Sequence, residues 1–194
     1  ALSTGRGYLG AAGTQNAALA FGGFAPSVSD VTEEYNGTSW SSGGTMINTR
    51  GKTEGAGAQN AGLAVGGYNP TLLSATEHYD GTAWSAGGDM SAARKSLSVT
   101  GVENAALRVG GSGGTKTEVE HYDGVAWSIG GSKNNDNHCA GAAAGTRTAG
   151  LYFGGGNPAP AQTCTEHYES YYASASFGRV EATSLSGSAE NLSN

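Results

Sequence analysis

A unit of about 44 residues occurs four times along this chain. The glycine pair Gly22-Gly23 returns at intervals of 44 residues, as Gly66-Gly67, Gly110-Gly111 and Gly154-Gly155. Each pair precedes a Glu-x-Tyr unit, whose glutamates are Glu33, Glu77, Glu120 and Glu166 and whose tyrosines are Tyr35, Tyr79, Tyr122 and Tyr168. A tryptophan follows each of the first three tyrosines, at Trp40, Trp84 and Trp127. Self-similarity at a fixed period predicts an array in which every unit packs on its neighbours.

The second repeat indicates how one unit is built. Ala61–Val65 is a short apolar run that follows a small-residue segment and is stopped by a glycine pair, as expected of a strand. Residues 75–79 alternate in polarity, and residues 82–85 are expected to form the returning strand. Between them, Asp80-Gly81 predicts a two-residue type I′ hairpin turn. The unit therefore holds four short antiparallel strands, which is the content of one β-propeller blade.

These motifs resemble the kelch repeat, a family marked by a double glycine after the second strand, a Glu-x-Tyr third strand, a following Trp and a closing Arg. The closing arginines in this chain are Arg6, Arg50 and Arg94. The resemblance covers residues 1–178 and implies an all-β, kelch-like β-propeller segment of four four-stranded antiparallel blades, at about residues 7–50, 51–94, 95–137 and 138–178. Asn137 replaces the third closing Arg, and Tyr172-Ala173 replace the fourth Trp, as expected of a terminal unit.

Residues 179–194 form a separate connector or tail segment. Its residues 186–193 are similar to connecting segments in virion fibre proteins of tailed phages, particularly marine ones, which also carry Gly-rich repeats with a Thr-Glu-x-Tyr-(Asn/Asp)-Gly core. That core stands here at residues 32–37 and 76–81. The resemblance implies a virion or extracellular location, and as partners other virion proteins or copies of this chain, such as a homotrimer. Because the chain opens inside a repeat unit, we expect it to be a piece of a longer array.

Composition argues against two classes of partner. Charged residues make up 13% of the chain, the net charge is −6, and no Lys/Arg run occurs, so we expect no nucleic-acid binding. No stretch approaches the ~18 consecutive apolar residues of a membrane helix, so we expect no membrane insertion.

The recurring ionisable residues favour a structural role, because a catalytic group is needed once whereas a stabilising contact is needed in every blade. We expect Glu77 and its equivalents to bind arginines of the repeat, and the Tyr and Trp columns to fill space between strands or blades. Histidines recur at His78, His121 and His167, and are expected to be half-exposed and too far apart to share a zinc ion. We therefore predict no metal, no cofactor and no catalytic residue. Cys139 and Cys164 are expected to be free thiols, unless the last blade is irregular enough for a disulfide.

The segments after the glycine pairs vary most between repeats, which is typical of binding loops on a repeated scaffold. Phe24 and Tyr68 could stack on a sugar, while Asn69 and Asn157 could bind its hydroxyls; plain solvent-exposed loops are the alternative. A proline in the second of these segments is expected to bar regular pairing. The sequence thus predicts a non-enzymatic structural or display module of a phage virion fibre or other extracellular surface protein, which contacts a receptor or glycan. The alternatives are an intracellular kelch adaptor that binds a protein and an enzyme built on a propeller.

Overall fold

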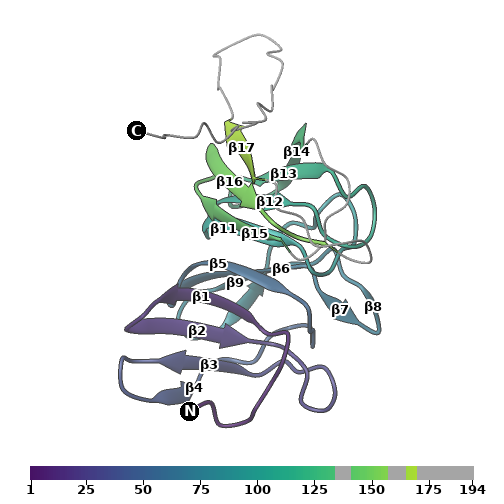
Figure 1. Cartoon of the computed structure of the whole chain (residues 1–194). Coiled ribbons are helices and arrows are strands. Elements are labelled where there is room, and N and C mark those ends of the chain that lie inside the picture. Colours follow the sequence, from purple (N-terminus) through teal and green to yellow (C-terminus); the bar gives the residue numbers. More distant parts are fainter. Residues whose placement is uncertain (134–140, 157–164, 170–194) are drawn as a thin grey trace, which may run out of the picture.

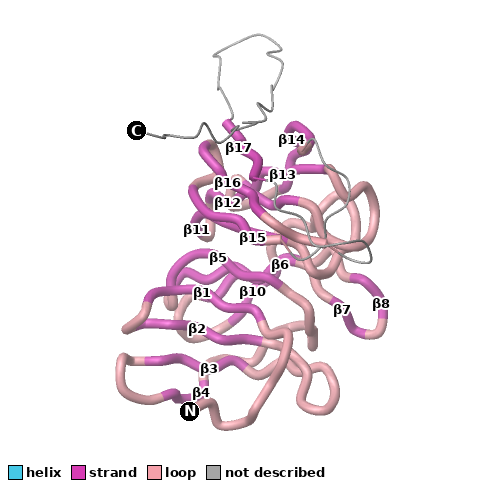
Figure 2. Tube along the Cα trace, in the orientation of Figure 1, coloured by secondary structure: helices cyan, strands magenta, loops and turns pink. Residues whose placement is uncertain are grey.

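The computed structural model describes residues 1–133, 141–156 and 165–169. These residues form strands and loops, and Figure 2 shows no helix among them. The strands build four antiparallel sheets arranged as the four blades of a β-propeller (Figure 1). The predicted all-β fold class is therefore confirmed.

Each blade uses its strands in chain order, so it is an up-and-down sheet. The first blade consists of β1 (Gly10–Thr14), β2 (Ala17–Phe21), β3 (Thr32–Tyr35) and β4 (Trp40–Ser42). The second consists of β5 (Glu54–Ala58), β6 (Ala61–Val65), β9 (Thr76–Tyr79) and β10 (Trp84–Ala86). The third consists of β11 (Ser98–Val102), β12 (Ala105–Val109), β13 (Glu118–Tyr122) and β14 (Trp127–Ser132). The described strands of the fourth are β15 (Ala142–Gly145), β16 (Ala149–Phe153) and β17 (Thr165–Glu169).

The segment after the second glycine pair forms a small hairpin, so the prediction that it lacks regular pairing is wrong. β7 (Tyr68–Asn69) pairs with β8 (Thr71–Leu72). Pro70 lies between the two strands, where the turn requires no backbone N–H from it. The proline therefore shapes the turn of this hairpin.

The turn after each Glu-x-Tyr unit is longer than predicted. Tyr79 pairs with Trp84, which leaves four residues in the connection. Asp80 Oδ1 accepts hydrogen bonds from the backbone N–H groups of Thr82 and Ala83, both at 2.8 Å. Gly81 has a φ of 92°, whereas Asp80 is not among the residues with positive φ. The two-residue type I′ turn is therefore wrong, because the aspartate side chain organises a four-residue loop that needs left-handed backbone only at the glycine.

The hydrophobic core lies between the blades. β1 packs on β5, β5 on β11, and β11 on β15, so the innermost strands follow one another around the axis. Each junction is filled from both sides, and the first contains Leu19, Phe21, Met46, Ala64, Tyr79 and Trp84. Figure 1 places β4 and β17 at opposite ends of the molecule. Of the described blades, the first and the fourth are thus the two end blades.

Backbone hydrogen bonds also link the blades near the axis. Tyr8, Lys52 and Ser96 are spaced by 44 residues and have left-handed φ values of 54°, 55° and 50°. The N–H of Lys52 donates to the carbonyl of Tyr8 at 2.8 Å, and the N–H of Ser96 donates to the carbonyl of Lys52 at 3.0 Å. The repeated conformation therefore places the start of each inner strand against its neighbour.

Several predictions concern residues outside the described ranges. These are Asn157, Cys139, Cys164, the end of the fourth repeat and the tail 179–194. No stretch of the described chain forms a helix with the length and hydrophobicity that crossing a bilayer requires.

Candidate functional site

A buried arginine ties together the second and third strands of the second blade. Arg50 donates through Nη1 to the carbonyls of Gly66 (3.0 Å) and Ala75 (2.9 Å), and through Nη2 to Glu77. The side chains of Arg50 and Glu77 are 0% and 1% exposed. A buried ion pair costs desolvation, which these hydrogen bonds through Nη1 and Nη2 offset. This pair therefore acts as a staple within the blade.

The first blade repeats the arrangement with Arg6. Its guanidinium donates to the carbonyls of Gly22 and Val31 and to Glu33 Oε2 at 2.6 Å. The backbone N–H of Ser3 donates to the other carboxylate oxygen at 2.7 Å. Burial alone would raise the pKa of Glu33, but the hydrogen bonds from Ser3 and Arg6 outweigh it and lower the pKa. The carboxylate is therefore ionised at neutral pH.

The third blade keeps the staple but changes the arginine. Arg108 on β12 donates to Glu120 and to the carbonyl of Glu118 (3.0 Å), the contacts that Arg50 makes one blade earlier. Arg94, which the repeat pattern offers for Glu120, instead donates to Glu118. Arg108 stands where the first two blades have an alanine, and Arg94 also donates to the carbonyls of Gly113 and Thr115.

The tyrosine hydroxyl of each inner blade reaches into the blade before it. Tyr79 donates to Glu34 Oε1 at 2.5 Å and accepts from the N–H of Gly44 at 3.2 Å. A Cβ added at Gly43 would lie 2.6 Å from the Tyr79 hydroxyl oxygen. Burial, followed by the bond to Glu34, raises the pKa of Tyr79 to about 12. The glycines that close each fourth strand thus make room for the next blade's tyrosine.

The histidines serve the same junctions. His78 Nε2 lies 2.7 Å from the hydroxyl of Tyr122, and its Nδ1 lies 2.8 Å from Glu103 Oε1. In the next junction His121 Nε2 contacts the hydroxyl of Tyr168. Burial lowers the pKa of His121, which is 8% exposed, so the expectation of half-exposed histidines is wrong there. These side chains are interface residues that bind the tyrosine of the following blade.

The histidines also lie in separate junctions. His167 is exposed on the fourth blade, one junction beyond His121. Within the described ranges, no group of three or more His, Cys, Asp or Glu side chains is placed to hold a metal ion. The histidine column therefore offers no shared coordination site in this part of the chain.

Tryptophans complete the junctions. Trp84 donates through its indole N–H to Thr32 Oγ1 of the first blade at 2.8 Å, and Trp127 donates to Thr76 Oγ1 at 2.9 Å. Trp84 is 7% exposed and is a junction filler, as predicted for this column. Trp40, in the first end blade, is half-buried and packs on a tyrosine of its own blade.

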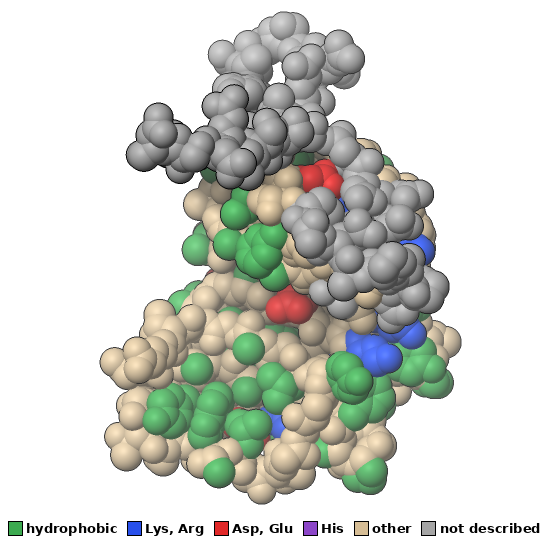
Figure 3. Space-filling view, viewed as in Figure 1, with side chains coloured by type: hydrophobic (Ala, Val, Ile, Leu, Met, Phe, Trp, Pro, Cys, Tyr) green, Lys and Arg blue, Asp and Glu red, His purple; other side chains and the backbone are tan. Residues whose placement is uncertain are grey.

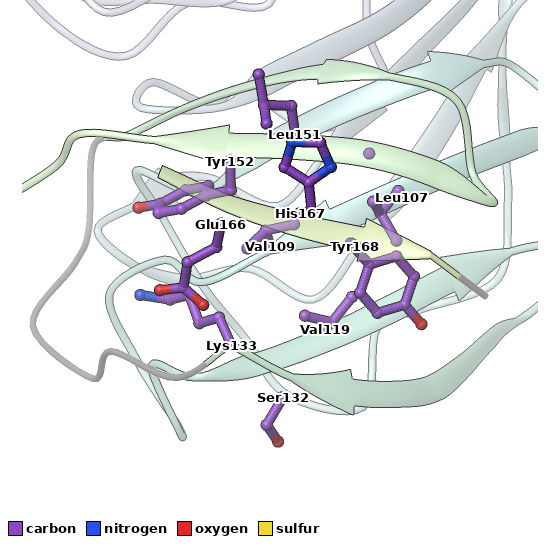
Figure 4. A pocket seen from close by; sticks show the side chains of 11 residues that line it. Leu107, Val109, Val119, Ser132, Lys133, Leu151, Tyr152, Glu166, His167 and Tyr168 are labelled. Atoms are coloured by element: carbon purple, nitrogen blue, oxygen red, sulfur yellow. The ribbon is translucent and has the colours of Figure 1, made fainter. Parts of the chain in front are cut away.

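A small gap marks the junction between the third and fourth blades. Val119 stands where the first two blades have threonine, and a cavity of about 20 Å³ lies beside it. Figure 4 shows Tyr168 on the same side of β17 as Val119, whereas Leu151 and His167 point to the opposite side. Such a volume holds about one water molecule, so the gap is too small for an organic ligand. Glu166, the fourth repeat glutamate, is buried at its edge.

Two of the predicted sugar-stacking residues are engaged in packing. Phe24 is half-buried, with its ring edge-on to Tyr8 at a centroid distance of 6.1 Å. One face of Tyr68 is covered by the ammonium of Lys95, 4.5 Å from the ring centroid. Asn69 donates its amide to the hydroxyl of Thr49. These contacts hold the post-glycine segments against their neighbours and reduce what they offer a ligand.

The structure instead places unlike side chains together near the axis. An open pocket of about 260 Å³ is lined by Tyr8, Leu9, Lys52, Thr53, Glu54, Ser96, Leu97 and Gly141. Tyr8 is 71% exposed, and the Lys52 ammonium lies 5.3 Å from its ring centroid. Segments of all four repeats contribute, so we call this the axial pocket. It combines an aromatic ring, an ammonium and a carboxyl group.

Glu54 is the distinctive residue of the axial pocket. It begins β5 at a position that carries Gly10, Ser98 and Ala142 in the other blades. None of the ion pairs among the described residues involves Glu54. Burial raises the pKa of Glu54 to about 7. At neutral pH this carboxyl group can therefore either donate or accept a hydrogen bond.

The surface provides little general charge. Figure 3 shows a face on which acidic and basic side chains are sparse among apolar and neutral ones. That distribution agrees with the 13% of charged residues in the sequence.

Sequence reasoning missed Arg108, Glu54, Tyr8 and the contacts of the His column. The sequence does contain a signal for Arg108 and Glu54, because each is a charged residue at a repeat position that is small or apolar in the other repeats. The His contacts cross between blades, so no spacing within one repeat reveals them. Tyr8 gives no such signal, because its repeat position carries a different residue type in each unit, Lys52 and Ser96 being its equivalents.

Two comparisons with known proteins find no match. A scan against protein-family models matches no family, and a search of curated proteins finds no similar sequence. The four-bladed architecture rests on the structure, and the kelch and virion-fibre resemblances rest on the motifs of the repeats and tail.

Proposed function

We propose that this chain is a kelch-type propeller segment, which serves as a non-enzymatic structural and display module of a phage virion fibre or another extracellular surface protein. We further propose that it binds a receptor glycan in the axial pocket. The scaffold role is supported by the use of the recurring ionisable groups. Arg50 and Glu77 bind each other within a blade, and Glu34 and Tyr79 bind each other between blades.

The axial pocket is the single observation that carries the ligand proposal. The junctions reuse the Tyr and Trp columns, whereas Tyr8, Lys52 and Ser96 share one repeat position in this open pocket and differ in residue type. The exposed ring of Tyr8 offers a face to the C–H groups of a pyranose. The Glu54 carboxyl and the Lys52 ammonium can bind hydroxyl or carboxylate groups of the same sugar. Phe24 contributes by supporting Tyr8 from the side.

The biological setting is supported by sequence resemblance. The Thr-Glu-x-Tyr-(Asn/Asp)-Gly cores and residues 186–193 are similar to segments of phage fibre proteins. In that setting the partners are other virion proteins, copies of the chain and a host receptor.

The test is a glycan array followed by calorimetric titration of the best binder. We expect Tyr8→Ala and Glu54→Gln each to weaken binding by about tenfold or more. Val125→Ser is the control, because Val125 is 77% exposed in an outer hairpin and is absent from the pocket lining. Failure of every glycan to bind, or binding that neither variant changes, would reject the ligand proposal. Capture of a cytosolic protein at the same pocket would favour the adaptor, and turnover of a substrate would favour the enzyme.

A further inference from the structure

We infer that the two end faces of the array bind each other between copies, so that the first blade of one copy packs on the fourth blade of a second copy. The inference goes beyond the proposed display function and does not depend on glycan binding. It rests on contacts that recur at the internal junctions and that the described residues of the two end blades do not make across a blade boundary.

Three polar contacts run from one blade back to the preceding one, and the first junction contains all three. The tyrosine hydroxyl binds Glu34 or a histidine, and the tryptophan indole binds a threonine. A side chain at the tip of the first hairpin also reaches back, as Gln59 does when it donates to the carbonyls of Ala18 (3.0 Å) and Tyr35 (2.8 Å). At the first junction the second blade therefore supplies the donors and the first blade the acceptors.

The first blade carries all three donors with no described blade before it. Gln15 stands at the hairpin tip and is exposed. Tyr35 is half-buried and donates its hydroxyl to the carbonyl of Gly37, in its own turn, at 3.0 Å. The indole of Trp40 is half-buried beside it. We call Gln15, Tyr35 and Trp40 the head face.

The fourth blade carries the matching acceptors. Thr165 and His167 are exposed, at the positions of Thr32 and Glu34. Figure 4 shows His167 and Leu151 on the side of the sheet that faces away from the third blade. Phe153 is 40% exposed, whereas its counterparts in the first three blades are almost fully buried, Phe21 at 0%, Val65 at 0% and Val109 at 3%. We call Leu151, Phe153, Thr165 and His167 the tail face.

The threonine–tryptophan pairing identifies which blade the tail face fits. Thr32 and Thr76 each precede a blade with a tryptophan, and each accepts its indole N–H. Val119 precedes the one repeat whose sequence lacks the tryptophan. The threonine returns at Thr165, and the remaining tryptophan without a threonine partner is Trp40. The threonine is thus present where the next blade supplies a tryptophan. Thr165 on the fourth blade therefore indicates a neighbouring blade with a tryptophan, as the first blade has in Trp40.

The proposed occupant of the tail face is the first blade of a second copy. The chain's own first blade lies at the opposite end of the molecule from β17 (Figure 1). The new junction continues the internal junctions with the same chemistry: Tyr35 would donate to His167, Trp40 to Thr165, and Gln15 to backbone carbonyls of the fourth blade. The association is head-to-tail, so the two contributing surfaces are different.

The experiment is sedimentation equilibrium of the 194-residue chain over a concentration series. We expect association at about 10–100 µM, as for a small interface. Trp40→Ala blocks the head face, with Gln15→Glu as a second variant that alters an exposed side chain. Thr165→Glu blocks the tail face, also at an exposed position. Each should weaken self-association by about tenfold or more, whereas Val125→Ser should leave it unchanged.

Mixing gives the decisive result. A head-blocked chain retains its tail face and a tail-blocked chain retains its head face, so an equimolar mixture should form a one-to-one complex although neither variant associates alone. Circular dichroism melts establish that each variant is folded. A wild-type chain that stays monomeric throughout the series overturns the inference. So does association that both blocks leave intact, or a mixture that fails to form the complex.

Discussion

The first and second blades carry the same junction residues in different surroundings. Tyr79 and Trp84 are 0% and 7% exposed, because the first blade covers them. Tyr35 and Trp40 occupy the same positions in the first blade and are half-buried. Burial of these side chains is therefore set by the preceding blade and is not a property of the repeat sequence. Variants made in pairs, one in each blade, can test that statement.

Removal of the tryptophan should give the largest difference in stability loss between the two blades. Trp84→Ala deletes an indole that packs on Phe21 at 5.0 Å and donates to Thr32, so unfolding should become easier by about 3–5 kcal/mol. Trp40→Ala should cost about 1 kcal/mol in the monomer, since its ring is only partly covered. Urea unfolding at a concentration where the chain is monomeric measures both. Equal losses of stability in the two variants would contradict the inferred role of the preceding blade.

The arginine–glutamate staple should behave differently, because it lies within a blade. Glu77→Gln and Glu33→Gln both leave a buried guanidinium without its counter-charge, and the free energy of unfolding should fall by about 3 kcal/mol in each. The same urea titrations measure it. A loss confined to Glu77 would show that this contact also needs the preceding blade.

The tyrosine hydroxyls provide a finer test. Tyr79→Phe removes the bond to Glu34 and leaves that acceptor in a covered junction, so it should cost about 1–2 kcal/mol. Tyr35→Phe removes a bond to an exposed turn and should cost less than about 0.5 kcal/mol. Thermal melts of the two variants beside wild type give the comparison. Similar shifts in Tm for both would contradict it.

Glu54 should give a small effect, and one that depends on pH. Its pKa is raised to about 7 in the folded chain from an ordinary value of 4.5, so the folded state holds the proton more tightly than the unfolded state. Stability from this group is present below about pH 4.5 and is lost as the pH rises through about 7. After allowance for partial solvent access, the loss should be about 1 kcal/mol, and Glu54→Gln should remove it. Parallel pH profiles of Tm for the two proteins would refute this assignment.

Much of the fold could be predicted because its signals are local and repeated. The glycine pairs, the Glu-x-Tyr units and the apolar run Ala61–Val65 fix strand ends and strand faces within each 44-residue unit. The turn length was predicted wrongly because Asp80 bonds two backbone N–H groups, and a dipeptide signal does not reveal that loop. The β7–β8 hairpin differs from the expectation because Pro70, a residue that ordinarily interrupts strand pairing, lies in its turn.

The candidate site was less predictable, for a physical reason. His78 binds Tyr122 across a junction, 44 residues away, so its role depends on how two blades pack. The axial pocket is likewise assembled from four separate repeats. An alignment of the four repeats does contain a signal for such sites, namely a residue that differs in type from its equivalents in the other repeats. Glu54 and Arg108 are both of this kind.

The glycines that admit the next tyrosine have a consequence for how such a chain can change over generations. Gly43 and Gly87 each make room for the hydroxyl of the following blade, at Tyr79 and Tyr122. Every unit thus carries one half of the junction on each side, in a constant order. Insertion or deletion of a whole unit by recombination would keep a glycine opposite each of these tyrosines. We therefore expect this contact to survive a change of array length by single blades, whereas the gain or loss of a partial unit would separate the glycine from its tyrosine.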